Sequence, residues 1–220
     1  IDGEFIKLNK GFSVFKMADS ADAIDVIKYF YLDNLKVNIV DFASDIAFNY
    51  PMERTVRYHE QNKCTVFRYL FSYDGGRNFM KIRDSITAPG STHGDELGYL
   101  FDIPLLKNTT AEDQVIIDRI TLLWTNFAKY GDPTPKTSEL LSVKWIPVTA
   151  GARPYLQIDT NLGLFNGPFE ERMAFWDSYY TKYGKFAKGI SLGEKFMENR
   201  SSAADLSKVM LLISGLLLCW

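Results

Sequence analysis

The first helical pattern along the chain starts at Ser20, a residue type that commonly caps helices. Apolar residues then recur at helical spacing, and they predict one buried face made of Ala23, Ile24, Ile27, Tyr31 and Leu32. We therefore expect a helix that packs through this face.

A second helical stretch is predicted over residues 37–61. Pro51 lies inside it and should kink or split the helix, because proline has no amide hydrogen to donate. His59 lies at its polar end, where a cation beside the helix C-terminus is an ordinary structural role. The predicted apolar positions are Ile39, Val40, Phe42, Ala43, Ile46, Ala47 and Tyr50.

A run of β-branched and aromatic residues follows in CTVFRYLFSYD, residues 64–74, and predicts a buried strand. Asp74, Gly75 and Gly76 form a turn signal at its end. Within this strand we expect Cys64 to be a buried free thiol. A polar loop then leads to His93.

The clearest helix is predicted between Asn108 and Pro133. Thr110 and Asp113 suit a capping arrangement, and Gly131 suits the C-terminal stop. Residues 154–159 predict a short strand, and residues 169–184 a closing helix. Because helices and strands mix, the fold class is α/β. Core packing is the expected role of the aromatic residues at helical spacing, which are Trp124, Phe127, Phe175 and Trp176.

Composition narrows the classes of function. The 220 residues carry a net charge of −2, and 46% of them are hydrophobic, as in ordinary globular domains. Basic residues are scattered without a stripe, so we expect no nucleic-acid partner. The two cysteines, Cys64 and Cys219, form no zinc-binding spacing, and we expect no metal. No signal peptide precedes the body of the chain, and we interpret this as a missing N-terminus.

His93 is the candidate for chemistry. It lies in GSTHGDELGYLF, residues 90–101, on a glycine-containing loop that follows a predicted strand. An imidazole there could accept a proton from a nucleophile and return it to a leaving group, or it could be a solvated loop residue. Upstream of His93, where the nucleophile of this chemistry would stand in the α/β-hydrolase chain order, the sequence has neither a G-x-S-x-G motif nor a glycine-rich oxyanion loop.

Four segments occur together in a familiar order. The chain resembles the C-terminal part of the type-B carboxylesterases, the group that includes cholinesterases and insect esterases, in ASDIAFNYPMERTVRYH, STHGDELGYLF, WTNFAKYGDPTP with VKWIPV, and ERMAFWDSYY. The resemblance spans residues 21–180. It implies an α/β-hydrolase fold, a mixed sheet with flanking helices. Residues 1–200 would be the C-terminal portion of a single domain and incomplete as a domain.

The resemblance also implies roles for particular residues. His93 matches the triad base, Glu96 a nearby acidic position, and Asp45 another inward-facing polar position. Relatives of this kind hydrolyse small-molecule carboxylic esters through an acyl-serine, without cofactor or metal. The nucleophile and the acid would lie upstream, since Glu4 stands too close to Asp45 and lacks a following glycine. We therefore expect the 220 residues alone to be inactive.

One departure narrows the type of esterase. Cholinesterases often carry a disulfide that matches Tyr50 and Ala174 here, and neither residue is a cysteine. The resemblance therefore favours a general esterase over acetylcholinesterase.

The C-terminus suggests membrane attachment. Residues 201–220 hold small residues, a short polar spacer and a terminal apolar run, which are the parts of a GPI-attachment signal. An amphiphilic tail without a lipid remains an alternative. Asn108 and Asn199 begin glycosylation sequons. We therefore expect a protein that is secreted or held on the extracellular face of a membrane.

Two other interpretations remain open. A cholinesterase-like adhesion protein would keep the fold, lose the triad and bind protein partners. A truncated product would leave a sheet edge and an apolar face uncovered, and we would expect it to aggregate.

Overall fold

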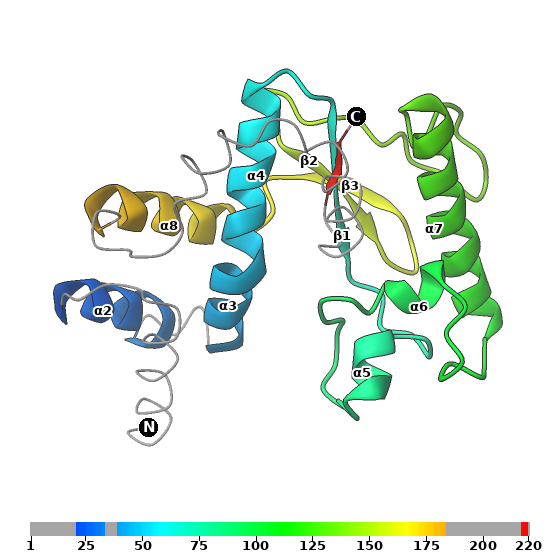
Figure 1. Cartoon of the computed structure of the whole chain (residues 1–220), viewed down its shortest axis with the longest axis horizontal. Helices are drawn as coiled ribbons and strands as arrows, with labels where there is room; N and C mark the ends of the chain where they lie inside the picture. Colours follow the sequence, from blue (N-terminus) through cyan, green and yellow to red (C-terminus); the bar gives the residue numbers. More distant parts are fainter. Residues whose placement is uncertain (1–20, 34–38, 184–216, 220) are drawn as a thin grey trace, which may run out of the picture. The chain divides into compact units, whose positions relative to one another are not determined.

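The computed structural model describes residues 21–33, 39–183 and 217–219. The chain divides into two compact units, residues 1–53 with 169–205 and residues 54–168 with 206–220. Figure 1 labels the α-helices of both units and the strands β1 to β3.

The first unit is helical. α2 (Ala21–Lys28) continues directly into the π-helical turn η1 (Tyr29–Asp33). α3 (Ile39–Ser44) continues into a second π-helical turn, η2 (Asp45–Asn49), and then into α4 (Tyr50–Gln61), which extends into the other unit. α8 (Glu170–Tyr183) completes the described part of this unit.

Aromatic side chains dominate the core of the helical unit. Trp176 is fully buried, lies against the ring of Tyr50, and donates a hydrogen bond of 2.7 Å to the Tyr31 hydroxyl. Tyr50 and Tyr180 stack with their ring centroids 5.1 Å apart. The core comprises Ala23, Ile27, Tyr31, Phe42, Ile46, Tyr50, Met173, Trp176, Tyr179 and Tyr183.

The second helix does not break at Pro51, because helical turns continue from Ile39 to Gln61 and a π turn stands directly before the proline. Pro51 is the second residue of α4 and follows η2, in which the Tyr50 amide bonds to the Asp45 carbonyl, five residues earlier. The wider turn accommodates a residue that cannot donate an amide hydrogen to the preceding turn. The predicted buried positions were wrong at Val40, Ala43 and Ala47, which are exposed, because the buried face of this stretch runs only through Phe42, Ile46 and Tyr50.

The second unit contains a four-stranded mixed sheet in the order β3-β2-β1-β4. β1 (Val66–Phe71) pairs parallel with β2 (Pro154–Ile158), and β2 pairs antiparallel with β3 (Gly163–Asn166). β4 (Leu217–Cys219) pairs antiparallel with the first half of β1. The predicted α/β class with a mixed sheet is confirmed.

The long helix α7 (Ala111–Tyr130) packs on the sheet, and its residues join those of β1 and β2 in one hydrophobic core. Its predicted caps are confirmed. The Thr110 side chain and Asp113 form a capping box, and Gly131 ends the helix with a left-handed φ of 68°. Trp145 is completely buried in the same core and donates a hydrogen bond of 3.0 Å to the Arg68 carbonyl.

Three predictions for this unit need correction. The loop expected before His93 contains a short helix, α5 (Phe79–Arg83). Cys64 is a half-buried free cysteine in the turn before β1, because the strand begins only at Val66. β3 and β4 were not predicted. A one-turn helix, α6 (Leu97–Leu100), follows the histidine segment.

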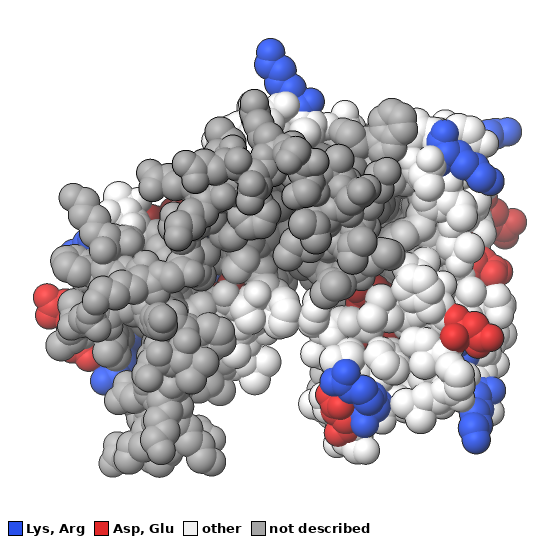
Figure 2. Space-filling model, in the orientation of Figure 1, with Lys and Arg blue, Asp and Glu red and all other residues white. Residues whose placement is uncertain are grey.

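Figure 2 shows the charged side chains of the described residues on one face of the molecule. Acidic and basic groups lie interspersed there, and neither sign covers a continuous area of the face shown. Of the helices within residues 21–33 and 39–183, none combines the length and apolarity that a membrane crossing requires.

Candidate active site

His93 lies on a short loop between α5 and α6, which we call the histidine loop and define as residues 90–96. The loop follows β1 in the chain, and the Ser91 hydroxyl donates a hydrogen bond of 2.8 Å to the Phe71 carbonyl at the end of that strand. A rigid strand therefore supports the loop at the position where catalytic side chains commonly gather.

The backbone conformation explains why a glycine follows His93. Gly94 adopts a φ of +87°, a region that residues with a side chain rarely enter. A Cβ atom at this position would also lie 3.0 Å from Cγ of Met80. Glycine therefore permits the sharp turn that directly follows His93.

The imidazole of His93 is half-buried. Burial lowers its pKa below the ordinary value of 6.5, because desolvation disfavours the charged form. The neutral ring, which can accept a proton, is therefore the main form at neutral pH. His59, in the last turn of α4, has a pKa lowered for the same reason, so the pKa shift alone does not distinguish the two histidines.

Glu96 is buried at the end of the histidine loop, with 6% of its surface exposed. Its carboxyl accepts hydrogen bonds from the backbone amides of Gly94 and of Glu96 itself. Burial, assisted by the nearby charge of Asp95, raises its pKa to about 7. Burial and then the charge of Glu96 raise the pKa of Tyr69 on β1. Glu96 is therefore near enough to Tyr69 for its charge to act on that hydroxyl.

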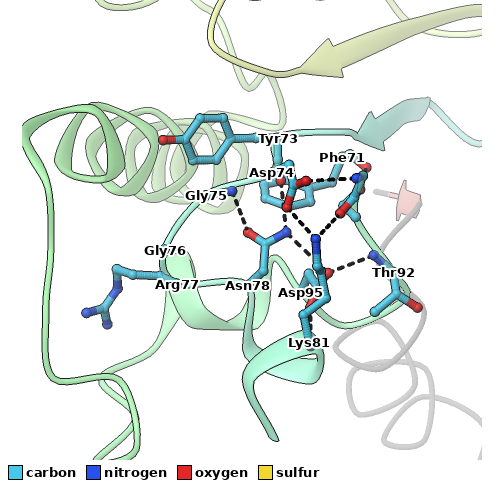
Figure 3. A network of polar contacts seen from close by, with 12 residues as sticks. Phe71, Tyr73, Asp74, Gly75, Gly76, Arg77, Asn78, Lys81, Thr92 and Asp95 are labelled. Carbon is cyan, nitrogen blue, oxygen red and sulfur yellow. Dashed lines mark hydrogen bonds and ion pairs between the residues drawn. The ribbon is translucent and has the colours of Figure 1, made fainter. Parts of the chain in front are cut away.

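Asp95 and Asn78 connect the loop to α5. Both side chains are buried, and the Asn78 amide nitrogen donates a hydrogen bond of 3.2 Å to the Asp95 carboxylate. Asp95 also accepts hydrogen bonds from the backbone amides of Thr92, at 2.7 Å, and Lys81, at 3.0 Å. Figure 3 shows Asn78, Lys81 and Asp95 converging, while Arg77 points away from them.

The same polar network extends to α7. The Tyr99 hydroxyl donates a hydrogen bond of 2.8 Å to the Asn78 side-chain oxygen and lies 3.3 Å from the carboxylate of Asp113. The Tyr73 hydroxyl donates to the same carboxylate, also at 3.3 Å. Sequence reasoning recognised Asp113 only as a helix cap and missed Asn78 and Tyr99, because their partners lie far away in the sequence.

Asp45 belongs to the helical unit, so of the two predicted acidic residues only Glu96 lies on the histidine loop. Asp45 is completely buried and accepts hydrogen bonds of 2.7 Å from the Tyr31 hydroxyl and from the Asn49 amide. Arg172 forms an ion pair with it, with 2.9 Å between Nε and the carboxylate. Burial raises the pKa of Asp45 although all three partners favour its charged form.

Of the two predicted glycosylation sites, Asn108 is exposed on the loop before α7, and Asn199 lies outside the described residues. Thr110, which completes the first sequon, caps α7. The tail predicted as an attachment signal is described only at residues 217–219, which form β4. Glu4 lies outside the described residues, and the parts of the chain that the structure describes hold no cluster of three or more acidic, histidine or cysteine residues fit to bind a metal.

The histidine loop after a strand, the mixed sheet and the covering helix define an α/β-hydrolase type of fold. The chain belongs to the carboxylesterase family, whose model matches residues 8–176. The resemblance found in the four sequence motifs is thereby confirmed, and the match includes His93, Glu96 and Asp45.

Individual relatives agree with this family. Human bile salt-activated lipase is 30% identical over 135 residues, which are 60% of this chain and 17% of the lipase. Bovine carboxylesterase 4A is 28% identical over 145 residues, covering 64% of this chain and 24% of the relative. Pig liver carboxylesterase is 28% identical over 144 residues, covering 65% and 24%. The chain thus spans a quarter or less of the length of these relatives.

Proposed function

We propose that the protein is a carboxylic ester hydrolase and that this chain supplies its catalytic histidine. The observation that carries the proposal is the position of His93 within a segment that matches the carboxylesterase family, on a loop that is hydrogen-bonded to the end of β1. Two of the relatives, the bovine and the pig protein, are named carboxylesterases. The substrate class is a small-molecule carboxylic ester.

The proposed reaction passes through an acyl-serine. Neutral His93 accepts the proton of a serine hydroxyl as its oxygen attacks the ester carbonyl. The resulting imidazolium protonates the departing alcohol, and His93 then activates a water molecule that releases the acid and restores the serine. The lowered pKa of His93 supports this role, because the ring must be neutral when the reaction begins.

Replacing His93 tests this proposal. In protein expressed from the complete transcript, His93→Ala should lower kcat/KM for p-nitrophenyl acetate by about 10³-fold or more, because it removes the proposed general base. His59→Ala is the matched control, since His59 is also half-buried with a lowered pKa, and it should change kcat/KM less than about twofold.

The outcomes separate the proposal from its alternatives. The 220 residues alone should show no saturable hydrolysis, because they contain no G-x-S-x-G segment upstream of His93, where this fold carries its nucleophile. Saturable hydrolysis by these residues that disappears in His93→Ala would overturn the predicted inactivity. A folded complete protein without esterase activity would favour the catalytically inactive adhesion or binding protein.

We also propose that the protein enters the secretory pathway and is held on the extracellular face of the membrane by a C-terminal lipid anchor. The exposed Asn108 sequon and the small-residue and apolar composition of residues 201–220 support this proposal.

In expressing insect cells, phosphatidylinositol-specific phospholipase C should release the protein, and a glycosidase should increase its gel mobility. Asn108→Gln should reduce the mobility change, whereas retention on the cells after phospholipase treatment would contradict the anchor.

A further inference from the structure

We propose that Asp95 is a positioning residue that fastens the histidine loop to α5 and thereby fixes the place of His93. The inference deepens the proposed esterase function and rests on it for its catalytic meaning. The structural part of the inference is that one buried carboxylate holds the loop, and it rests only on the hydrogen bonds of Asp95.

Asp95 holds the chain on both sides of His93. Its carboxylate accepts the Thr92 amide at 2.7 Å, and its own amide donates to the Thr92 carbonyl at 3.1 Å. Thr92 precedes His93 directly, so the two hydrogen bonds close a tight turn with His93 at its corner. The backbone freedom of His93 is therefore restricted by the residues immediately around it.

The same side chain attaches this turn to α5. Its second carboxylate oxygen accepts the Lys81 amide at 3.0 Å, and the Asp95 carbonyl accepts the Phe79 amide at 3.4 Å. Hydrogen bonds to an ionised acceptor are stronger than those between neutral groups. Asp95 is also completely buried, where water does not compete for these donors.

Asn78 fixes the direction of the Asp95 contact. Its amide nitrogen donates to the Tyr73 carbonyl at 3.0 Å and to Asp95 at 3.2 Å. Its oxygen accepts the Gly75 amide at 3.1 Å and the Tyr99 hydroxyl at 2.8 Å. If the Asn78 amide were flipped, its NH₂ group would face the Gly75 amide, which is also a donor, and its oxygen would face acceptor oxygens of Tyr73 and Asp95. Only one orientation therefore satisfies all four partners.

The outer end of the histidine loop has a separate attachment. Asp74 accepts the Gly90 amide at 2.8 Å, and Lys81 Nζ bonds to Asp74 at 2.5 Å and to the Gly90 carbonyl at 2.7 Å. These contacts, drawn beside the Asp95 contacts in Figure 3, are exposed to solvent. Exposed ion pairs contribute little, so the buried attachment through Asp95 should dominate the placement of His93.

Titration of the two histidines of this chain in the complete protein provides a direct test. With histidine-selective isotope labelling, the imidazole signals of His59 and His93 are assigned from the His59→Ala and His93→Ala variants and can then be titrated separately. In Asp95→Asn, an amide group replaces one acceptor oxygen, and a backbone donor loses its partner. We expect the His93 signal to shift and broaden and its pKa to move toward 6.5 as the ring becomes hydrated, while His59 stays unchanged.

Asp74→Asn is the matched control, because it alters the exposed attachment of the same loop and should leave the His93 titration unchanged. An unchanged His93 titration in Asp95→Asn would overturn the proposal. So would the joint collapse of both signals, because Asp95 would then maintain the fold of the unit and not the position of one loop.

Kinetics of the complete protein provide the second readout. Asp95→Asn should lower kcat by roughly 10²-fold, the cost of a catalytic group misplaced by about 1 Å, with little change in KM. Asp74→Asn should change kcat less than about twofold. An inactive parent protein with the expected NMR shift would refute the esterase function and leave the positioning role intact. An active parent without the kcat loss would refute the positioning role.

Discussion

Glu96 shows how burial changes the chemistry of a single residue. Its carboxyl has a pKa of about 7 because burial disfavours the charge and the neighbouring Asp95 adds repulsion. The hydrogen bonds that it accepts from the backbone amides of Gly94 and Glu96 lower the pKa, but by less than burial raises it. Near neutral pH the group next to the turn of His93 is therefore partly protonated.

This raised pKa predicts a pH-dependent stability. Between about pH 4.5 and 7 the folded state holds a proton on Glu96 that the unfolded state has lost. The free energy of unfolding should therefore fall as the pH rises through this range, with a contribution of roughly 3 kcal/mol. Glu96→Gln cannot ionise, so it should be more stable than the parent above pH 7 and similar to it at pH 4. Denaturant unfolding across this pH range measures the difference.

Glu139→Gln, at an exposed position, is the control and should retain the pH dependence of the parent. Parallel stability curves for the parent and Glu96→Gln would show that the carboxyl does not titrate in this range. Asp45, whose pKa is also raised, contributes equally to both proteins and cancels in the comparison.

The short helix α6 illustrates a constraint at the level of elements. Gly98 lies within it, and a Cβ atom built there would lie 1.9 Å from the Arg77 carbonyl and 2.7 Å from Leu106. Arg77 binds the same turn, because its Nε donates to the Gly98 carbonyl at 2.9 Å. The backbone of α6 therefore packs directly against the segment that leads into α5.

Gly98→Ala should be destabilising, because the clashing atom belongs to the backbone and not to a flexible side chain. We expect a loss of about 1–3 kcal/mol in the free energy of unfolding, the range typical of overpacking. Gly151→Ala is the matched control, since a Cβ there meets open space and should change the stability by less than about 0.5 kcal/mol. If Gly98→Ala changed the free energy of unfolding as little as the control, α6 would have to shift and accommodate the added methyl group without destabilising the protein.

At the scale of the whole molecule, segments far apart in the chain form the sheet. β1 precedes α7 and β2 follows it, yet the two strands pair in parallel, and the Ser72 amide donates to the Ile158 carbonyl at 3.0 Å. α7 covers the resulting surface, and its buried residues complete the core with those of the strands. The histidine loop is thus supported by elements that only tertiary folding brings together.

Sequence patterns predicted well where the cause is local. The capping box of Thr110 and Asp113 and the stop at Gly131 each depend on a few neighbouring residues, and both are confirmed. β3 was missed because its four residues are too few to establish a period, and half of its side chains are exposed. Val40 was wrongly predicted as buried because an apolar residue type does not by itself show which side of the helix faces the core.

The sequence by itself determined the fold class, the family and the candidate histidine, because periodicity, caps and motif spacing are written along the chain. Tertiary structure alone decided what surrounds His93. Asn78 bonds to Asp95 and Tyr99 across long stretches of chain, and Glu96 acquires its raised pKa only on burial. Hydrogen bonding and desolvation depend on which groups meet in space, so no local pattern in the sequence could have predicted them.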